Sequence, residues 1–238
     1  MSEFDRLLDL QVLDTHTDQL RHRLTHDPLI ADRAAARAAR AEVESSIADR
    51  SAALAAIRQR QGQLEGEVTA VEARIAKEEG VLYGGTLTAH KDLEALQHEI
   101  ATLRGMQGDL EVLVLEQMEL ADPVEAELAQ LGADLDAAEA AVGAAEAAVT
   151  VLEAELGVEL ESIAGRRAEL VAGLPEAIVS AYEATRRSSG GVGAARLGAG
   201  GKCEACHLTL SRVDVDQIKK APPDELVRCP ECGRILVR

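Results

Sequence analysis

The stretch Leu96–Leu135, LQHEIATLRGMQGDLEVLVLEQMELADPVEAELAQLGADL, decides how most of this chain folds. Alternate steps of four and three residues from Leu96 to Leu170 meet apolar side chains at eighteen of twenty-two positions, in one unbroken register. Glu159 and Arg166 are among the four exceptions. An apolar repeat that averages 3.5 residues lets a helix bury one stripe against a partner helix in a left-handed coiled coil. The pattern therefore predicts one very long coiled-coil helix.

A second repeat precedes this helix and supplies a partner for it. The same stepping from Val43 to Leu82 finds apolar residues at nine of twelve positions, and a shorter seam runs from Leu10 to Leu24. Asp27-Pro28 has the order of an N-cap and a first-turn proline, so we expect a helix break or a kink there. Asp122-Pro123 repeats that order, but the apolar register continues across it. We therefore expect a kink at Pro123 and no turn.

The segment Gly80–His90 separates the two repeats and contains a Gly-Gly pair. It is the natural tip of a hairpin, because the flanking arms, 4–82 and 91–169, are equally long. Equal arms favour an antiparallel coiled coil within one chain, with a tip near 80–90 and a monomeric protein; a parallel dimer is the alternative. The hairpin domain is expected to span 1–172, and Tyr83, Leu87 and Lys91 are candidate partner-binding residues at its tip.

Composition and charge favour an elongated helical protein over a compact enzyme. The chain has 238 residues and a net charge of −17, and its aromatic residues are Phe4, Tyr83 and Tyr182. Residues 173–238 contain ten Lys/Arg and eight Asp/Glu, net +2, so residues 1–172 carry −19. Such an acidic body repels duplex DNA and anionic membranes. The absence of a secretory segment and of any long apolar run leads us to expect a cytoplasmic protein without membrane contact.

The four cysteines form two pairs, Cys203-x-x-Cys206 and Cys229-x-x-Cys232. Two such pairs in a short segment are typical of one tetrahedral zinc site. Four thiolates leave no open position, so we expect a single structural Zn²⁺ ion per chain. Disulfides would require an oxidising compartment, a thioredoxin-like pair a βαβ context, and haem attachment at the Cys-x-x-Cys-His pattern would leave the second pair unexplained.

The region 173–238 is predicted to contain short elements around this C4 zinc ribbon. Glu176–Arg187 has the pattern of a short amphipathic helix, and Ser211 is placed to cap a helix over 212–220 with Val213, Val215 and Ile218 facing inward. Short strands are expected at 193–197, 226–228 and 234–237.

This order of features resembles the bacterial C4-type zinc-ribbon family that carries a long N-terminal coiled-coil hairpin. At the tip the resemblance rests on Leu82-Tyr83-Gly84-Gly85 and the sequence from Lys91 to Ile100. At the other end it rests on Tyr182, Gly191, Cys203-x-x-Cys206-His207 and Cys229-Pro230-Glu231-Cys232-Gly233-Arg234-Ile235-Leu236. It implies a mostly α fold, with a ribbon of short β strands after the hairpin. It also implies an adaptor or regulatory role through protein and RNA contacts.

We therefore expect a non-enzymatic adaptor whose coiled-coil arm binds a protein and whose ribbon binds protein or nucleic acid. The alternative is a zinc-ribbon regulator linked to transcription that binds RNA or DNA. Basic residues of the ribbon are the candidate nucleic-acid contacts, although the ribbon has no aromatic side chain on which unpaired bases could stack. The candidates are Lys202, Arg212, Lys219, Lys220, Arg228 and Arg234.

Overall fold

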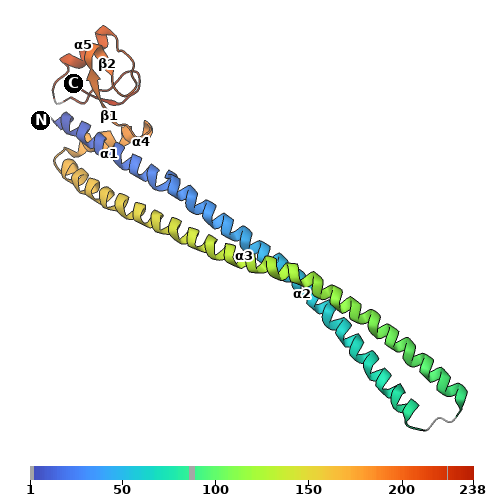
Figure 1. The fold of residues 1–238 in the computed structure, drawn as a ribbon. Coiled ribbons are helices and arrows are strands. Elements are labelled where there is room, and N and C mark those ends of the chain that lie inside the picture. Colours follow the sequence, from blue (N-terminus) through green and yellow to red (C-terminus); the bar gives the residue numbers. More distant parts are fainter. Residues whose placement is uncertain (1–2, 86–88, 224) are drawn as a thin grey trace. The chain divides into compact units, whose positions relative to one another are not determined.

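The structure, a computed structural model, describes residues 3–85, 89–223 and 225–238 (Figure 1). Long helices dominate it and short strands form a small sheet near the C-terminus, as the sequence predicts, although the strand at Lys202–Cys203 was not expected. In chain order the elements are α1 (Glu3–His26), α2 (Pro28–Tyr83), α3 (His90–Ala172), α4 (Glu176–Ser188), β1 (Ala194–Gly198), the 3-10 turn η1 (Ala199–Gly201), β2 (Lys202–Cys203), α5 (Arg212–Lys220) and β3 (Ile235–Val237).

These elements form two compact units. The first consists of residues 1–33 and 145–238, and the second of residues 34–144. The boundary expected after residue 172 falls inside the first unit, where the base of the helical hairpin and the ribbon share a core. None of the helices in the described ranges combines the length and the apolar character that crossing a bilayer requires.

In the second unit, α2 and α3 pack as an antiparallel coiled coil. Ile75 of α2 is buried against Ile100 and Leu103 of α3. Ion pairs along the flanks join Arg74 to Glu99 and Arg58 to Glu125, so residue numbers rise on α3 as they fall on α2. The heptad seam thus closes within one chain, which confirms the predicted hairpin fold.

In the first unit the seam changes register, which the sequence reading did not anticipate. Leu152 and Leu156 are buried against α1, and the next inward positions are Leu160, Ile163 and Arg167, whereas Glu159 and Arg166 are exposed. The extra four-residue step is a stutter in the heptad pattern. The predicted register therefore holds at Ile163 and Leu170 but is wrong at Glu159 and Arg166. An ion pair between Arg167 and Asp14 of α1 accompanies the shift.

The two predicted proline sites differ in the structure. α1 ends at His26 and α2 begins at Pro28, with the Asp27 carboxylate accepting the backbone N–H of Leu29 at 3.2 Å. This bond, followed by the hydrogen bond from Arg23, lowers the pKa of Asp27. By contrast, α3 continues as one helix through Pro123.

The ribbon sheet has the order β2-β1-β3. β1 is antiparallel to β2, with Leu197 opposite Cys203, and parallel to β3, with Ala194 opposite Ile235. Ser211 caps α5 by accepting the backbone N–H of Asp214, as predicted. Two expectations are wrong: Val213 is 65% exposed, and the segment 226–228 makes only one isolated bridge, from Arg228 to Ile235.

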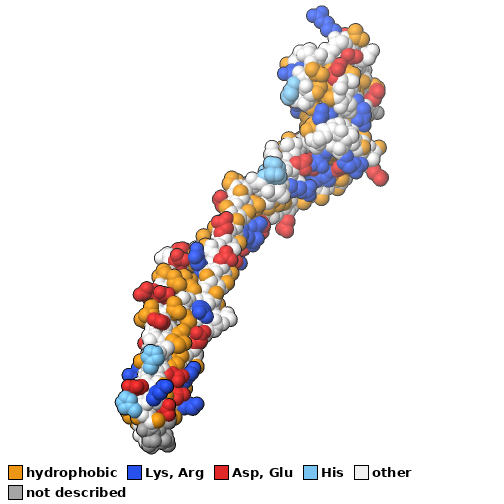
Figure 2. All heavy atoms as spheres, turned by 90° about the vertical axis from the view of Figure 1, so that its right-hand side faces the viewer, with side chains coloured by type: hydrophobic (Ala, Val, Ile, Leu, Met, Phe, Trp, Pro, Cys, Tyr) orange, Lys and Arg blue, Asp and Glu red, His pale blue; other side chains and the backbone are white. Residues whose placement is uncertain are grey.

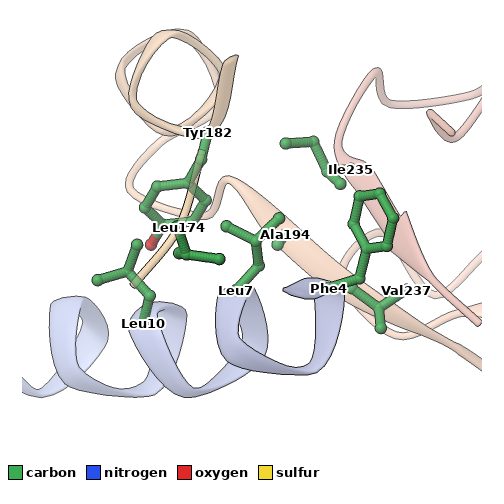
Figure 3. Packing of buried hydrophobic residues seen from close by; sticks show 8 residues of the cluster. All are labelled: Phe4, Leu7, Leu10, Leu174, Tyr182, Ala194, Ile235 and Val237. Atoms are coloured by element: carbon green, nitrogen blue, oxygen red, sulfur yellow. The ribbon is translucent and has the colours of Figure 1, made fainter. Parts of the chain in front are cut away.

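The core of the first unit joins the two ends of the chain. Figure 3 shows Leu7 and Leu10 of α1 pointing toward Tyr182, while Phe4 lies beside Val237 of β3. All of these side chains are buried. Because each fully buried large apolar side chain contributes about 1.5–3 kcal/mol, the ribbon and α1 stabilise each other.

Candidate metal centre

The two cysteine pairs lie in two backbone turns with the same hydrogen-bond pattern. In the first, the backbone N–H of Cys203 donates to Leu208 and that of His207 donates back to Cys203; the distances are 3.0 and 2.9 Å. In the second, Cys229 donates to Arg234 and Gly233 donates back to Cys229, both at 2.8 Å. The sequence -Cys-x-x-Cys- thus forms the same knuckle twice.

The residue after each pair has a left-handed backbone conformation. Gly233 has φ +70°, and His207, at the corresponding position, has φ +62°. Glycine adopts this conformation without steric cost. A side chain makes it less favourable, and histidine is among the residues that tolerate it more often. The repeated conformation explains why a Cys-x-x-Cys-His and a Cys-x-x-Cys-Gly sequence give equivalent turns.

The two knuckles bring the four sulfur atoms together. The Sγ atoms of Cys203, Cys206, Cys229 and Cys232 all lie within 4.8 Å of one another, and the pairs Cys203–Cys232 and Cys206–Cys229 are 4.0 Å apart. Four sulfurs bound to zinc at about 2.3 Å lie about 3.8 Å apart in a regular tetrahedron. A disulfide would bring two of them to about 2.0 Å. The donor set fits one zinc ion, in agreement with the sequence prediction.

The surroundings shift the pKa values of Cys203, Cys229 and Cys232 in different directions. Burial raises the pKa of Cys229 to about 12 and also raises the pKa of Cys203. Burial acts in the same direction on Cys232, but hydrogen bonds from Arg234 and neighbouring thiols lower the pKa of Cys232 to about 7. A divalent cation supplies the charge that holds all four groups as thiolates. Metal binding is therefore expected to release protons at neutral pH.

A buried polar network joins the helices at the base of the hairpin. Asp14 of α1 is 3% exposed and accepts hydrogen bonds from Arg167 Nε at 2.6 Å and from Tyr182 OH at 2.8 Å. Arg186 Nε lies 3.6 Å from the same carboxylate, and Arg167 also pairs with Glu183. The network thereby joins α1, α3 and α4.

Gln11 extends this network to the start of the sheet. Its side-chain oxygen accepts the backbone N–H of Gly193 at 2.6 Å, and its amide donates to Gly191 at 3.0 Å. A Cβ atom at Gly193 would lie 2.8 Å from the Tyr182 ring, so this position requires glycine. Sequence reasoning missed Gln11 and Asp14. The available signal was that Gln11 and Asp14 lie on the same helical face as Leu7 and Leu10.

The predicted nucleic-acid contacts divide into two groups. Lys202, Arg212, Lys219 and Lys220 are exposed. Arg228 is also exposed, but it donates to Thr185 Oγ1 at 2.8 Å and to the Gly233 carbonyl at 2.9 Å, and the half-buried Arg234 donates to the carbonyls of Val192 and Ser189 at 3.1 and 2.7 Å. The guanidinium groups of the second group therefore hold the second knuckle in place.

The predicted tip residues lie at the facing ends of the hairpin helices. Tyr83 is the last residue of α2 and is 82% exposed, and Lys91 is exposed in the first turn of α3. Leu87, the third candidate, lies outside the described residues. Within the ranges that the structure describes, the four cysteines are the one cluster of three or more potential metal ligands.

Comparison with known proteins agrees with this architecture. Residues 10–190 match the CT398-like coiled coil hairpin domain, and residues 202–236 match the C4-type zinc ribbon domain. The uncharacterized protein Rv2229c of Mycobacterium tuberculosis is 36% identical over 243 aligned residues, which cover 98% of this chain and 94% of the relative.

Two solved structures extend the likeness to three dimensions. A protein from Mycobacterium smegmatis gives a TM-score of 0.90 at 29% identity, with 100% of this chain and 98% of the other covered. CT398 from Chlamydia trachomatis gives 0.78 at 19% identity, with 98% and 96% covered, and shows the shared fold.

Proposed function

The chain belongs to the CT398-like coiled-coil hairpin family and carries a C4-type zinc ribbon, and from this premise we propose that it is a non-enzymatic adaptor. In this proposal the helical hairpin binds a protein partner, and the ribbon binds a second partner, either protein or nucleic acid.

The geometry of the four sulfurs carries this proposal. Cys203, Cys206, Cys229 and Cys232 converge on one point. A zinc ion held by four thiolates has no open position for water or substrate, which is typical of structural sites. Metal binding of this kind contributes about 10–16 kcal/mol of apparent folding free energy. A small ribbon that buries little apolar surface depends on such a contribution.

The packing of the ribbon on α1 supports an adaptor in a second way. Phe4 and Leu7 share a buried cluster with Ile235 and Val237, and the Asp14 network adds polar contacts from α3 and α4. The ribbon is thus held on the base of the hairpin. A partner bound to the ribbon would therefore be held at that base.

A crosslinking pull-down with full-length variants tests the adaptor proposal. Deleting the ribbon would expose Phe4 and Leu7, so surface substitutions are the sharper tool. We expect Lys219→Glu with Lys220→Glu to remove ribbon-dependent partners, and Tyr83→Ala with Lys91→Ala to remove a different set. If wild-type protein captures nothing above a mock control, or if both variants retain every partner, the proposal is wrong.

Nucleic-acid binding by the ribbon is the second candidate function, as part of a regulator linked to transcription. The exposed cations at Lys202, Arg212, Lys219 and Lys220 favour it, because neutralised phosphates release counterions and strengthen binding. A gel-shift series with single-stranded RNA and duplex DNA over increasing salt tests it. We expect weak binding that declines with salt, and no detectable binding at low salt would exclude this candidate.

A further inference from the structure

An open groove of about 470 Å³ lies between α2 and α3 in the unit formed by residues 34–144. Its apolar lining comes from Val68 and Val114, which are half-buried, and from Leu115, which is 57% exposed. Met118, one helical turn beyond Leu115, is 43% exposed. Thr69 completes the uncharged lining. This apolar surface is continuous with the seam of the coiled coil but is not covered by it.

Two carboxylates, Glu65 of α2 and Glu111 of α3, also line the groove. Their hydrogen-bond donors are neutral amides: Gln61 donates to Glu65 at 2.8 Å, and Gln107 donates to Glu111 at 2.8 Å. Gln107 also donates to Glu72 at 3.1 Å. No Lys or Arg is among the residues that line the groove.

The lack of a cation in the groove contrasts with the neighbouring flanks of the hairpin. There, Arg58 pairs with Glu125, Arg50 pairs with Glu127, and Arg104 pairs with Glu79. The sequence accentuates the contrast, because residues 105–165 contain fifteen Asp/Glu and no Lys, Arg or His. Figure 2 shows apolar side chains exposed among acidic ones along the hairpin. The groove therefore combines uncovered apolar surface with uncompensated negative charge.

We propose that this groove binds a cationic amphipathic helix of a partner protein. An amphipathic helix places apolar side chains in a groove at i, i+3 and i+4 spacing. Here those side chains would cover Val68, Val114 and Leu115. Flanking Lys or Arg residues would rest their methylene groups on the same surface and carry their charge to Glu65 and Glu111. This inference rests on the proposed function only in that the hairpin binds a protein.

Charge complementarity favours a basic partner helix over a second copy of this chain and over nucleic acid. A second copy placed groove to groove would set Glu65 and Glu111 against the same two carboxylates. Nucleic acid would bring phosphates to a surface without cations, where it is repelled. A partner helix with a basic face lowers the repulsion between the carboxylates while it covers the apolar lining.

The test uses zinc-loaded full-length protein and a defined peptide probe. The probe is a fluorescent amphipathic Leu/Lys helix of about 18 residues, or about five helical turns, and the control peptide has Glu in place of every Lys. We expect the Lys peptide to bind and the Glu peptide not to bind. Affinity for the Lys peptide should fall at least tenfold when ionic strength rises from about 0.05 M to about 0.5 M, because salt screens exposed charges.

Matched variants locate the binding surface. We expect Glu65→Gln with Glu111→Gln, and separately Leu115→Gln, to weaken peptide binding by about tenfold, which corresponds to about 1.4 kcal/mol. The controls are Glu116→Gln with Glu119→Gln, which removes the same charge from exposed positions outside the groove lining, and Val112→Gln, which replaces an equally exposed apolar residue. The controls should change affinity less than twofold, and circular dichroism should show unchanged helix content in all variants.

Several results would overturn the inference. Equal losses in groove and control variants would mean diffuse charge attraction, and equal binding of both peptides would mean non-specific apolar adsorption. A dimer in light scattering that Leu115→Gln abolishes would identify a second copy as the occupant. If the groove variants capture the same cellular partners as wild type, the groove assignment fails while the adaptor function stands. If wild type captures no partner but the peptide binds as expected, the adaptor function fails and the groove remains.

Discussion

At the scale of single residues, Asp14 is the group on which the first unit most depends. Its carboxylate is almost fully buried and is contacted by Arg167, Arg186 and Tyr182. Breaking a buried ion pair leaves an uncompensated charge, which costs more than the pair contributes when intact. The network is thus a site where one substitution affects α1, α3 and α4 together.

Replacing Asp14 by asparagine is expected to lower the free energy of unfolding by about 3–5 kcal/mol, because two arginines lose their buried partner. Denaturant unfolding followed by circular dichroism measures the change. Asp9→Asn is the matched control, since Asp9 is an exposed carboxylate on the same helix, and it should remain within about 0.5 kcal/mol of wild type. Similar losses in both variants would show that the network does not stabilise the fold.

Tyr182 gives the network a pH dependence in alkaline solution. Burial, and then its hydrogen bond to Asp14, raise the pKa of Tyr182 above its ordinary value near 10. Below pH 10 the phenol is neutral in folded and unfolded chains, so its contribution is complete there. Above pH 10 the unfolded chain loses this proton first, and stability should fall by up to about 1.4 kcal/mol per pH unit.

The measurement uses a Tyr83→Phe background, in which Tyr182 is the only tyrosine. Tyrosinate absorbance should appear together with unfolding, at a pH well above 10. Adding Tyr182→Phe should remove this component of the alkaline loss of stability. If the Tyr182 phenol ionises near pH 10 in the folded protein, its pKa is not raised and this prediction is wrong.

At the scale of elements, the register of α3 is the feature that the heptad pattern alone does not fix. The four-three stepping places Glu159 in the seam, whereas the structure places Leu160 there, packed against the cluster that contains Leu20 of α1. Leu160 offers apolar surface, and Arg167 reaches Asp14 only in this register. Local pairing therefore overrides the strict 3.5-residue repeat near the base of the hairpin.

Alanine substitutions distinguish the two registers. Leu160→Ala should lower the free energy of unfolding by about 2 kcal/mol, at the low end for a core leucine because the side chain is only half-buried. Glu159→Ala should change it by less than about 0.5 kcal/mol, since its ion pair with His16 is exposed. A larger loss of stability for Glu159→Ala than for Leu160→Ala would mean that the unbroken heptad register is correct.

At the scale of the whole molecule, zinc binding and the packing of α1 are linked. β3 follows the second knuckle directly, and its Ile235 and Val237 share a core with Phe4 and Leu7. A ribbon that unfolds without metal would remove one side of that core. The second unit, residues 34–144, has its own buried seam of Ile75, Ile100 and Leu103.

Removal of zinc by exhaustive chelation should therefore increase amide hydrogen exchange in residues 194–238 and in α1, while residues 64–110 keep their protection. Hydrogen exchange with mass spectrometry measures both regions in one sample. Zinc added back should restore protection and release protons, because the Cys203 and Cys229 thiols bind protons more tightly than free cysteine. If the ribbon unfolds and hydrogen exchange in α1 does not change, zinc binding and the packing of α1 are not linked.

The sequence by itself determined the long antiparallel helices, the break at Asp27-Pro28 and the four metal ligands. Each follows from a periodic or local pattern: the heptad repeat, a capping residue before proline, and paired cysteines two residues apart. Such patterns depend on neighbours within a few residues, so the chain alone reveals them.

Only the tertiary structure decided which polar residues are buried, where the seam changes register and which arginines remain free. Gln11 and Asp14 meet Tyr182 and Gly193 across more than 160 residues. Arg228 donates to the Thr185 hydroxyl and Arg234 to the Ser189 carbonyl, both of which other segments supply. These partners are specified by packing between distant segments. Side chains of the same type, such as Arg212 and Arg234, therefore look alike in sequence and differ in the fold.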